Sequence, residues 1–493
     1  CIVYYVVFNN MPKKLKEERN ESMSVQNNNV KPFGMRDKIG YMFGDLGNDF
    51  TFTFASSYLM VFYTNVLGIP ASMVGILFLV ARFIDAFTDI GMGVLIDRVK
   101  PAKDGKFKPW IRRMCGFVAI AAFLMYQSGM ANAPMWLRIV YMFATYILWG
   151  SFAYTSINIP YGSMASAITS NPAQRAELST FRSMGASFAG VAIGIIVPQV
   201  IYHEVDGQQV ASGTAFTIAA AVFSVLAIIS YILCYKMTTE RVKIEKDPNE
   251  KAPTAAESVK ALVSSRALLA LIAAAIVLLL STMLGQSMNQ YLYINWFNDR
   301  NALSVAGMIA LPIVLIMAVV VGRITARFGK KEAGTVGMLV SGLIYILLGF
   351  LKIQNAYLYL VIVFFGMLGM YYFNMVIWSY ITDVIDDMEV KSGHREDGTV
   401  YGVYSFARKI GQALAGGLSG FALEAIGFVS GASVQAPEVN EAIYSLANFG
   451  PGVMYVIVAL LLLFAYPLSK SVVIKNGEIL EKRRQERLSK ENK

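Results

Sequence analysis

The sequence predicts an all-α membrane protein in which twelve membrane-spanning helices form two six-helix bundles. Hydrophobic residues make up 56% of the 493 residues and charged residues only 15%, whereas soluble domains have about 45–50% and about 25%. The mean hydropathy is +0.50. Apolar runs follow one another along the chain, and one long polar linker divides them into two sets of six. This composition excludes a water-soluble enzyme.

Two residue counts limit the metal and partner chemistry. The only histidines are His203 and His394, so a histidine-rich metal or haem site is not expected. Cys1, Cys115 and Cys234 show no CxxC spacing, which argues against a zinc ribbon or a disulfide framework. The net charge of +10 does not indicate nucleic acid, because the basic residues cluster between the apolar runs.

The apolar runs define the expected spans, each long enough to cross about 30 Å of hydrocarbon. In chain order they cover residues 39–66, 71–97, 111–130, 136–165, 181–202, 212–236, 267–296, 303–327, 333–351, 356–382, 400–426 and 448–469. Residues 1–34 are expected to be a disordered leader with an over-extended start, because they lack the features of a signal peptide. The remaining divisions are a bundle at 35–238, a linker at 239–264, a bundle at 265–470 and a basic tail at 471–493.

Basic residues mark one set of helix ends. They gather at 31–38, 98–113, 236–266, 323–331 and 470–493, whereas the opposite ends have only Arg138, Arg300 and Lys352. The positive-inside rule therefore places both termini and the linker in the cytoplasm. We expect a multi-pass protein of the bacterial inner (cytoplasmic) membrane, with the lipid bilayer as its partner.

The two halves of the chain repeat each other. Residues 93–98 after the second span correspond to residues 322–331 after the eighth, at an offset of 229. Residues 182–185 in span five correspond to residues 408–411 in span eleven, at an offset of 226. A parallel repeat of six-helix bundles is typical of major facilitator transporters, which bind substrate near the midplane between the halves. We expect that fold, as a monomer.

An acidic pair lies inside span two. Asp85 and Asp89 are four residues apart and therefore share one face of a helix. Ionisable groups in an apolar span are costly, and two like charges this close must share a proton or hold a cation. Oxygen ligands suit a light, hard cation, and Thr88 offers a further oxygen. The alternative is a structural anchor in which the pair bonds to Arg82.

Further polar residues project from other spans, and opposed donors and acceptors suit the hydroxyl groups of a sugar. These candidate sugar-binding residues are Asp49, Tyr154, Asn158, Arg182 and Lys409. The alternative for Arg182 and Lys409 is snorkelling to the membrane interface, and we interpret Arg408 as structural.

Two more segments have open interpretations. A polar stripe in span seven, including Gln286, Asn289 and Gln290, either lines the cavity or faces the other half. Residues 383–395 are expected to be a cytoplasmic loop facing the basic segment at 93–113, and they form either a solvated loop or a gate of salt bridges. The candidate gate residues are Asp383, Asp386, Glu389 and Arg395.

Four segments resemble the glycoside–pentoside–hexuronide:cation symporters of the major facilitator superfamily. They are YMFGDLGNDF at 41–50, LVARFIDAFTD at 79–89, GKFKPW at 105–110 and NIPYGS at 158–163. The resemblance extends over about residues 36–470, and its specific parts are the acidic pair and GKFKPW.

The resemblance implies roles for individual residues. The co-transported cation (Na⁺, H⁺ or Li⁺) would bind Asp85 and Asp89, and the resemblance adds Thr155 and, as a further ligand, Thr88. The other implied roles are sugar contact for Asp49 and Arg182, a link between the two sites for Lys409, and an inner gate for Asp383, Asp386 and Arg395.

The chain departs from the melibiose-carrying members at three positions. It has Asn158 in place of a second sugar-binding aspartate, Gly162 in place of a tryptophan and Asn48 in place of a lysine. A galactoside is therefore not expected, while pentosides, glucosides and uronides stay open.

The expected function is cation-coupled symport of a glycoside, pentoside or oligosaccharide by alternating access, driven by a Na⁺ or H⁺ gradient. A hexuronide or glucuronide symporter is the first alternative. A lysolipid carrier and a non-transporting membrane receptor are the others. No resident cofactor, no nucleic-acid partner and no enzymatic activity are expected.

Overall fold

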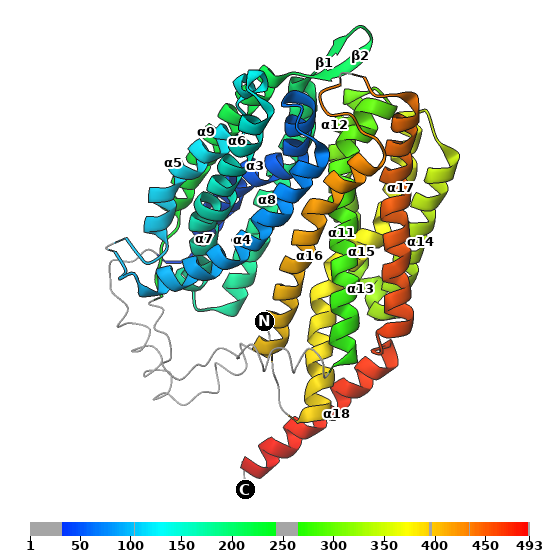
Figure 1. The fold of residues 1–493 in the computed structure, drawn as a ribbon. Coiled ribbons are helices and arrows are strands. Elements are labelled where there is room, and N and C mark those ends of the chain that lie inside the picture. The colour runs from blue at the N-terminus through cyan, green and yellow to red at the C-terminus, as the bar shows by residue number, and fades with distance from the viewer. Residues whose placement is uncertain (1–31, 103, 243–264, 394–396, 433, 492–493) are drawn as a thin grey trace.

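Two helical bundles stand side by side in the computed structural model, which describes residues 32–102, 104–242, 265–393, 397–432 and 434–491 (Figure 1). The hairpin of β1 (Tyr202–Val205) and β2 (Gln208–Ala211) projects from one end of the molecule, which we call the hairpin end. We call the opposite end the basic end. The expected leader, most of the central linker and Arg395 lie outside the described residues.

The N-terminal bundle contains α3 to α9. Its helices are α3 (Met35–Val61) with the π-helical turn η1 (Phe62–Val66), α4 (Ala71–Arg98), α5 (Lys108–Leu124), the short η2 (Ser128–Asn132), α6 (Met135–Ile147), the π-helical η3 (Leu148–Tyr154), α7 (Thr155–Ile168), α8 (Pro172–Ile201) and α9 (Gly213–Met237).

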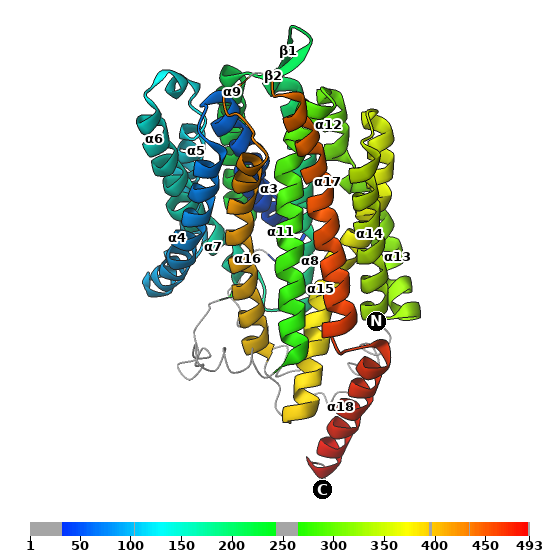
Figure 2. The same ribbon diagram turned by 45° about the vertical axis from the view of Figure 1, so that its right-hand side comes forward.

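The C-terminal bundle contains α11 to α17, and α18 follows it at the basic end (Figure 2). Its helices are α11 (Arg266–Tyr291) with η4 (Leu292–Trp296), α12 (Arg300–Met308), α13 (Ala310–Phe328), α14 (Lys330–Leu351), α15 (Ala356–Ser392), α16 (Asp397–Ala425), α17 (Pro437–Leu460) with η5 (Leu461–Ala465) and α18 (Lys470–Glu491).

The outer faces of the helices are apolar, as lipid contact requires. On α14 the exposed side chains recur at helical spacing at Val336, Val340, Leu343, Leu347 and Phe350. Nine helices of the described residues are long and apolar enough to cross a membrane. The exact number of twelve spans stays a prediction.

The repeat that the sequence predicts is visible in the backbone. After η1 the amide of Ile69 donates to the carbonyl of Tyr63 over 2.9 Å, and after η4 the amide of Asp299 donates to the carbonyl of Tyr293 over the same distance. The two π-helical turns are 230 residues apart, close to the offsets found in the sequence. Each of them ends the first helix of its bundle.

Several helices are longer than expected. The segment 383–391, interpreted from the sequence as a loop, is a continuation of α15 to Ser392. That interpretation was wrong because no helix-breaking residue precedes Gly393, whose φ of +77° ends the helix. The fifth span begins earlier, at Pro172, and the basic tail forms α18.

The GKFKPW segment forms a turn that anchors the start of the linker. The carboxylate of Glu240 accepts hydrogen bonds from the amides of Lys106, Phe107 and Lys108 over 2.7–2.9 Å at the start of α5. A carboxylate is favourable at a helix N-terminus. Nearby, burial acts to raise the pKa of Asp104, but the hydrogen bond from Tyr235 leaves that pKa below its usual value.

Glycines bring the two bundles together toward the hairpin end. A Cβ atom on Gly420 of α16 would lie 2.3 Å from the carbonyl oxygen of Ala71 on α4, and one on Gly194 of α8 would lie 3.0 Å from the Cα of Gly307 on α12. Hydrogen bonding joins the bundles in the same region, where the hydroxyl groups of Thr64 and Tyr291 are hydrogen-bonded to each other over 2.9 Å. The bundles are therefore closed against each other at the hairpin end.

Candidate functional site

The acidic pair of α4 faces two hydroxyl groups from η3 and α7. Ser151 donates to Oδ1 of Asp85 over 2.6 Å, and Thr155 donates to Oδ1 of Asp89 over 2.9 Å. Both pairs are 66 residues apart, so α4 and the η3–α7 rod run parallel at this point. The result is a compact group of two carboxylates and two hydroxyls.

The surroundings of this pair fit both interpretations made from the sequence. Arg82 lies 3.3 Å from Oδ2 of Asp85, as the structural anchor would require. The hydroxyl of Thr88 donates to the carbonyls of Ile84 and Asp85 in its own helix. The structure thus brings Thr155 to the pair, whereas the hydroxyl proton of Thr88 is directed to the helix backbone.

Ser151 is a residue that the sequence analysis missed. It lies in the π-helical η3, whose wider turn changes which side chains face α4. Its side chain is buried at 1% exposure. A signal existed, because Ser151 and Thr155 have the same four-residue spacing as Asp85 and Asp89.

A second polar group surrounds α3. Arg182 of α8 donates through Nε to Oδ1 of Asp45 over 2.9 Å, and its guanidinium lies over the ring of Tyr161. Asp49 accepts a hydrogen bond from Thr53 over 3.4 Å. The salt bridge of Arg182 is thus made with Asp45, four residues before the predicted Asp49. The sequence spacing Asp45–Asp49 repeats that of the acidic pair and was the available signal.

Asn158 belongs to a chain of hydrogen bonds. Its Oδ1 accepts from Nδ2 of Asn48 over 3.4 Å, and Oδ1 of Asn48 accepts from the hydroxyl of Tyr231 over 2.8 Å. Two of the three departures from the melibiose-carrying pattern, Asn48 and Asn158, therefore contact each other. The ring of Tyr154 stacks on that of Phe52 with centroids 5.6 Å apart.

A cavity of about 610 Å³ lies between the two bundles, within the range of about 300–1,000 Å³ typical of small-molecule sites. Its polar lining includes Thr53 and Ser57 of α3, Gln286 and Asn289 of α11, and Arg408 of α16. Gln286 also donates to Ser57 over 3.0 Å. Gln286, Asn289 and Gln290 of the span-seven stripe thus line the cavity, and Gln286 also contacts the other bundle.

The predicted sugar residues adjoin this cavity to different degrees. Asp49 is not a lining residue itself, but it accepts a hydrogen bond from Thr53, which lines the cavity. Asn158 and Arg182 are not among the lining residues. The side chain of Lys409 lies outside the described residues. Arg408, interpreted from the sequence as structural, lines the cavity.

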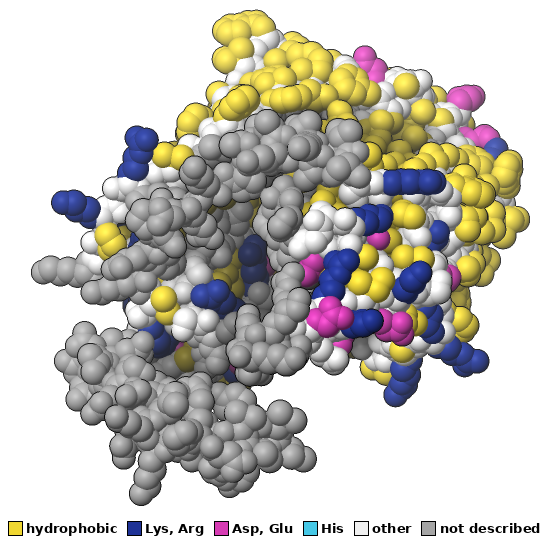
Figure 3. Space-filling view, turned by 90° about the horizontal axis from the view of Figure 1, so that it is seen from below, with side chains coloured by type: hydrophobic (Ala, Val, Ile, Leu, Met, Phe, Trp, Pro, Cys, Tyr) yellow, Lys and Arg dark blue, Asp and Glu magenta, His cyan; other side chains and the backbone are white. Residues whose placement is uncertain are grey.

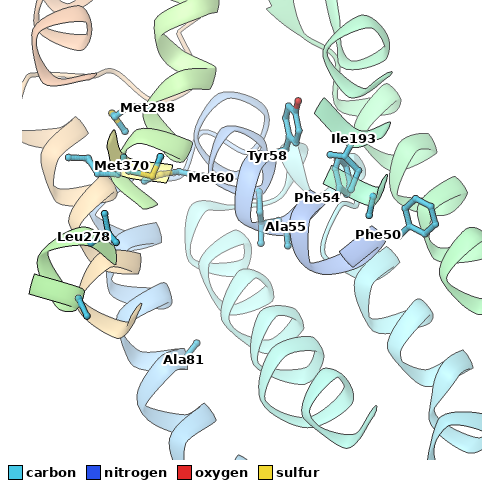
Figure 4. Close-up of a cluster of buried hydrophobic side chains, with 14 of the residues drawn as sticks. Phe50, Phe54, Ala55, Tyr58, Met60, Ala81, Ile193, Leu278, Met288 and Met370 are labelled. Atoms are coloured by element: carbon cyan, nitrogen blue, oxygen red, sulfur yellow. The ribbon is translucent and has the colours of Figure 1, made fainter. Parts of the chain in front are cut away.

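An apolar cluster extends across the line between the bundles. Figure 4 shows Met60 of α3 gathered with Leu278 and Met288 of α11 and Met370 of α15. Leu278 and Met370 also line the cavity. Unbranched methionines adapt to changes in packing, as a surface that moves during transport would need.

Three of the predicted gate residues, Asp383, Asp386 and Glu389, lie on the extended part of α15, and Arg395 lies outside the described residues. Asp383 accepts from Nζ of Lys330, at the start of α14, over 2.6 Å. The neighbouring Asp387 accepts from Lys391 over 2.6 Å and from Asn476 of α18 over 3.2 Å. Asp383 thus has a partner in its own bundle here, and a gate across the bundles stays a prediction. Figure 3 shows acidic and basic side chains gathered together on the described part of this face.

The fold and the cavity between two repeated bundles define a membrane transporter. The family model described as "MFS/sugar transport protein" matches residues 40–470, so this chain belongs to that family of major facilitator transporters. The match confirms the fold class and the resemblance to the glycoside–pentoside–hexuronide symporters. Members of the family are transporters rather than enzymes.

Three curated relatives resemble the chain over most of its length. An uncharacterized symporter of Bacillus subtilis (strain 168) is 29% identical, covering 92% of this chain and 96% of its own. A putative sulfoquinovose importer of Salmonella typhimurium is 32% identical, covering 88% and 90%. An isoprimeverose transporter of Lactiplantibacillus pentosus is 30% identical, covering 87% and 88%.

Solved structures share the fold. The crystal structure of a D-xylose–proton symporter superposes with a TM-score of 0.59 at 13% identity, covering 88% of this chain and 98% of its own. At this identity the likeness concerns the fold alone.

Proposed function

We propose that this protein is a cation-coupled sugar symporter that works by alternating access. The observation that carries the proposal is the group of Asp85, Asp89, Ser151 and Thr155, held inside a transporter of the sugar family. Two carboxylates four residues apart repel each other unless a cation lies near them. Hard oxygen ligands favour Na⁺, Li⁺ or H⁺ over soft metals.

The position of α4 suggests how the cation and the sugar are coupled. A cation at the acidic pair would hold α4 against the η3–α7 rod through Ser151 and Thr155. The same helix packs on α16 of the other bundle through Gly75 and Gly420. A ligand shifts a conformational equilibrium only by binding one state more tightly, and coupling between two ligands is reciprocal. Each ligand should therefore raise the affinity for the other.

The charge distribution suggests the orientation. Lys330, Lys331 and the residues of α18 lie at the basic end, which the positive-inside rule assigns to the cytoplasm of the cell membrane. The hairpin end would then face outward. Because the bundles are in contact at that end, this conformation would be the one that is closed to the outside.

The substrate class rests on the family and on the polar lining. One relative is named for sulfoquinovose, an acidic sugar, and another for isoprimeverose, a neutral sugar. A glycoside, pentoside or oligosaccharide is our first candidate, and Asp49 would accept its hydroxyl hydrogens. A hexuronide is the second candidate, and it is favoured by Arg408 in the cavity lining.

Uptake by proteoliposomes tests the proposal. Asp85→Asn and Asp89→Asn should each abolish accumulation of radiolabelled sugar driven by a Na⁺ or H⁺ gradient, whereas exchange of bound sugar survives. The matched control is Asp206→Asn in the exposed hairpin, which should leave accumulation unchanged. Gradient-driven uptake that persists in both variants would overturn the cation assignment. Counterflow of lysolipid instead of sugar would overturn the substrate class.

A further inference from the structure

The cavity between the bundles contains an isolated positive charge. Among the described residues that line it, Arg408 is the only one with a side chain charged at neutral pH. Its guanidinium lies 5.3 Å from the centroid of the Trp378 ring, and no carboxylate of the described residues forms a salt bridge with it. A charge in a membrane-embedded cavity is expensive unless a partner compensates it. The described residues of the lining supply no carboxylate as a partner.

Uncharged polar groups line other parts of the same cavity. The lining brings Gln286, Asn289 and Gln290 of α11 and Asn374 of α15 to the same cavity. Gln290 is 5% exposed, and its Oε1 has no hydrogen-bond partner among the described residues. A buried polar oxygen without a partner costs free energy, and a ligand hydroxyl could donate to it. Amide side chains both donate and accept, as recognition of a sugar ring requires.

We propose that Arg408, held over the ring of Trp378, forms an anion-binding subsite in the C-terminal bundle, which selects sugars that carry a carboxylate or a sulfonate. The guanidinium is a planar fork that binds either group through two parallel hydrogen bonds. Its stacking on Trp378 fixes the plane of the fork. The subsite rests on the proposed function and deepens its substrate class, because it favours an acidic sugar, the second candidate above, over a neutral one.

This subsite is separate from the polar group around α3. There Arg182 already has the carboxylate of Asp45 as its partner over 2.9 Å, so its charge is compensated within the protein. Arg408 has no such partner among the described residues. The two arginines therefore differ in the charge they offer to a ligand, and the acidic group of the sugar should be placed at Arg408.

Binding of matched ligands to the purified, full-length protein tests the subsite. The probes are p-nitrophenyl β-glucoside, the matching glucuronide, and the matching glucoside that carries a sulfonate at C6. The wild-type protein should bind at least one acidic probe more tightly than the neutral one. Arg408→Gln should weaken binding of that acidic probe by about ten- to hundred-fold, the range for hydrogen bonds to charged groups. Binding of the neutral probe should change less than two- to three-fold.

Two further variants complete the experiment. Arg408→Lys keeps the charge but loses the fork, so it should give an intermediate loss of acidic-probe binding. Arg323→Gln removes an exposed arginine of α13 in the same bundle and should change nothing. Neutral-probe binding also shows that each variant is folded.

The outcomes separate this subsite from the proposed function. The subsite is overturned if the wild-type protein binds the neutral probe more tightly than both acidic probes. It is also overturned if Arg408→Gln weakens binding of all probes equally, or of none. In each case the proposed sugar binding still stands. A wild-type protein that neither binds nor transports any of the sugars would overturn the proposed function itself.

Discussion

Ser151 is a single hydroxyl that belongs to the proposed cation site. It donates to Asp85 over 2.6 Å from a π-helical turn, and it is almost fully buried. A cation bound between the carboxylates would take the Ser151 oxygen as a neutral ligand, with the hydroxyl proton turned aside. The proposed site therefore combines oxygens from α4 and from the η3–α7 rod.

We expect Ser151→Ala to raise the cation concentration needed for half-maximal sugar uptake by about ten-fold or more. The reason is that a hydrogen bond to a charged group contributes about 1.5–3 kcal/mol. The measurement is the cation concentration that gives half-maximal uptake in proteoliposomes. Ser156→Ala is the matched control, because its hydroxyl donates to the carbonyl of Phe152 in its own helical rod. Equal effects of the two changes would remove Ser151 from the site.

At the scale of helices, α4 and α16 make a close backbone contact at the closed hairpin end. Gly420 faces the backbone of α4, and its Cβ position lies 2.7 Å from the amide nitrogen of Gly75. Backbone atoms cannot rotate away as a flexible side chain can. Even one added methyl group must therefore separate the two helices.

We expect Gly420→Ala to disfavour the closed hairpin end, because overpacking costs about 1–3 kcal/mol. A reporter cysteine at Gly190, which lines the cavity and has open space around it, should then be labelled faster from the outer side. The native cysteines are replaced in every variant. Gly116→Ala is the control, since nothing lies within 4 Å of its Cβ position. Unchanged labelling would show that this contact does not limit opening.

For the whole molecule, the basic end offers charges that can exchange partners. Asp383 pairs with Lys330 in this conformation, and Asp387 is held by Lys391 and Asn476. Asp386 lies between them on α15 and is partly exposed. When the bundles close at the basic end, Asp386 would meet basic residues of the N-terminal bundle.

We expect Asp386→Asn to shift the population toward the state that is open at the basic end. Labelling of the same reporter cysteine from the cytoplasmic side should rise by up to several-fold, since an exposed ion pair contributes about 0.2–1 kcal/mol. Asp387→Asn is the control, because the contacts of Asp387 stay within α15 and α18. If both variants behave like the wild type, the charged segment is a solvated surface rather than a gate.

Local sequence determined a large part of this protein. Composition and the length of the apolar runs predicted a membrane protein, because burial in lipid requires apolar helix faces over a fixed length. The offsets between repeated motifs predicted two equivalent bundles, and η1 and η4 show the same offset in the backbone. Four-residue spacing was enough to place Asp85 and Asp89 on one helical face, because helix geometry is local.

Only the tertiary structure decided which side chains meet across helices. The pairing of Ser151 with Asp85, the choice of Asp45 as the partner of Arg182, and the place of Arg408 in the cavity all join residues on different helices or bundles. Such contacts depend on how far each helix is rotated about its axis and on where glycines let two helices approach. That rotation is set by packing across the whole bundle, and a single sequence does not state it.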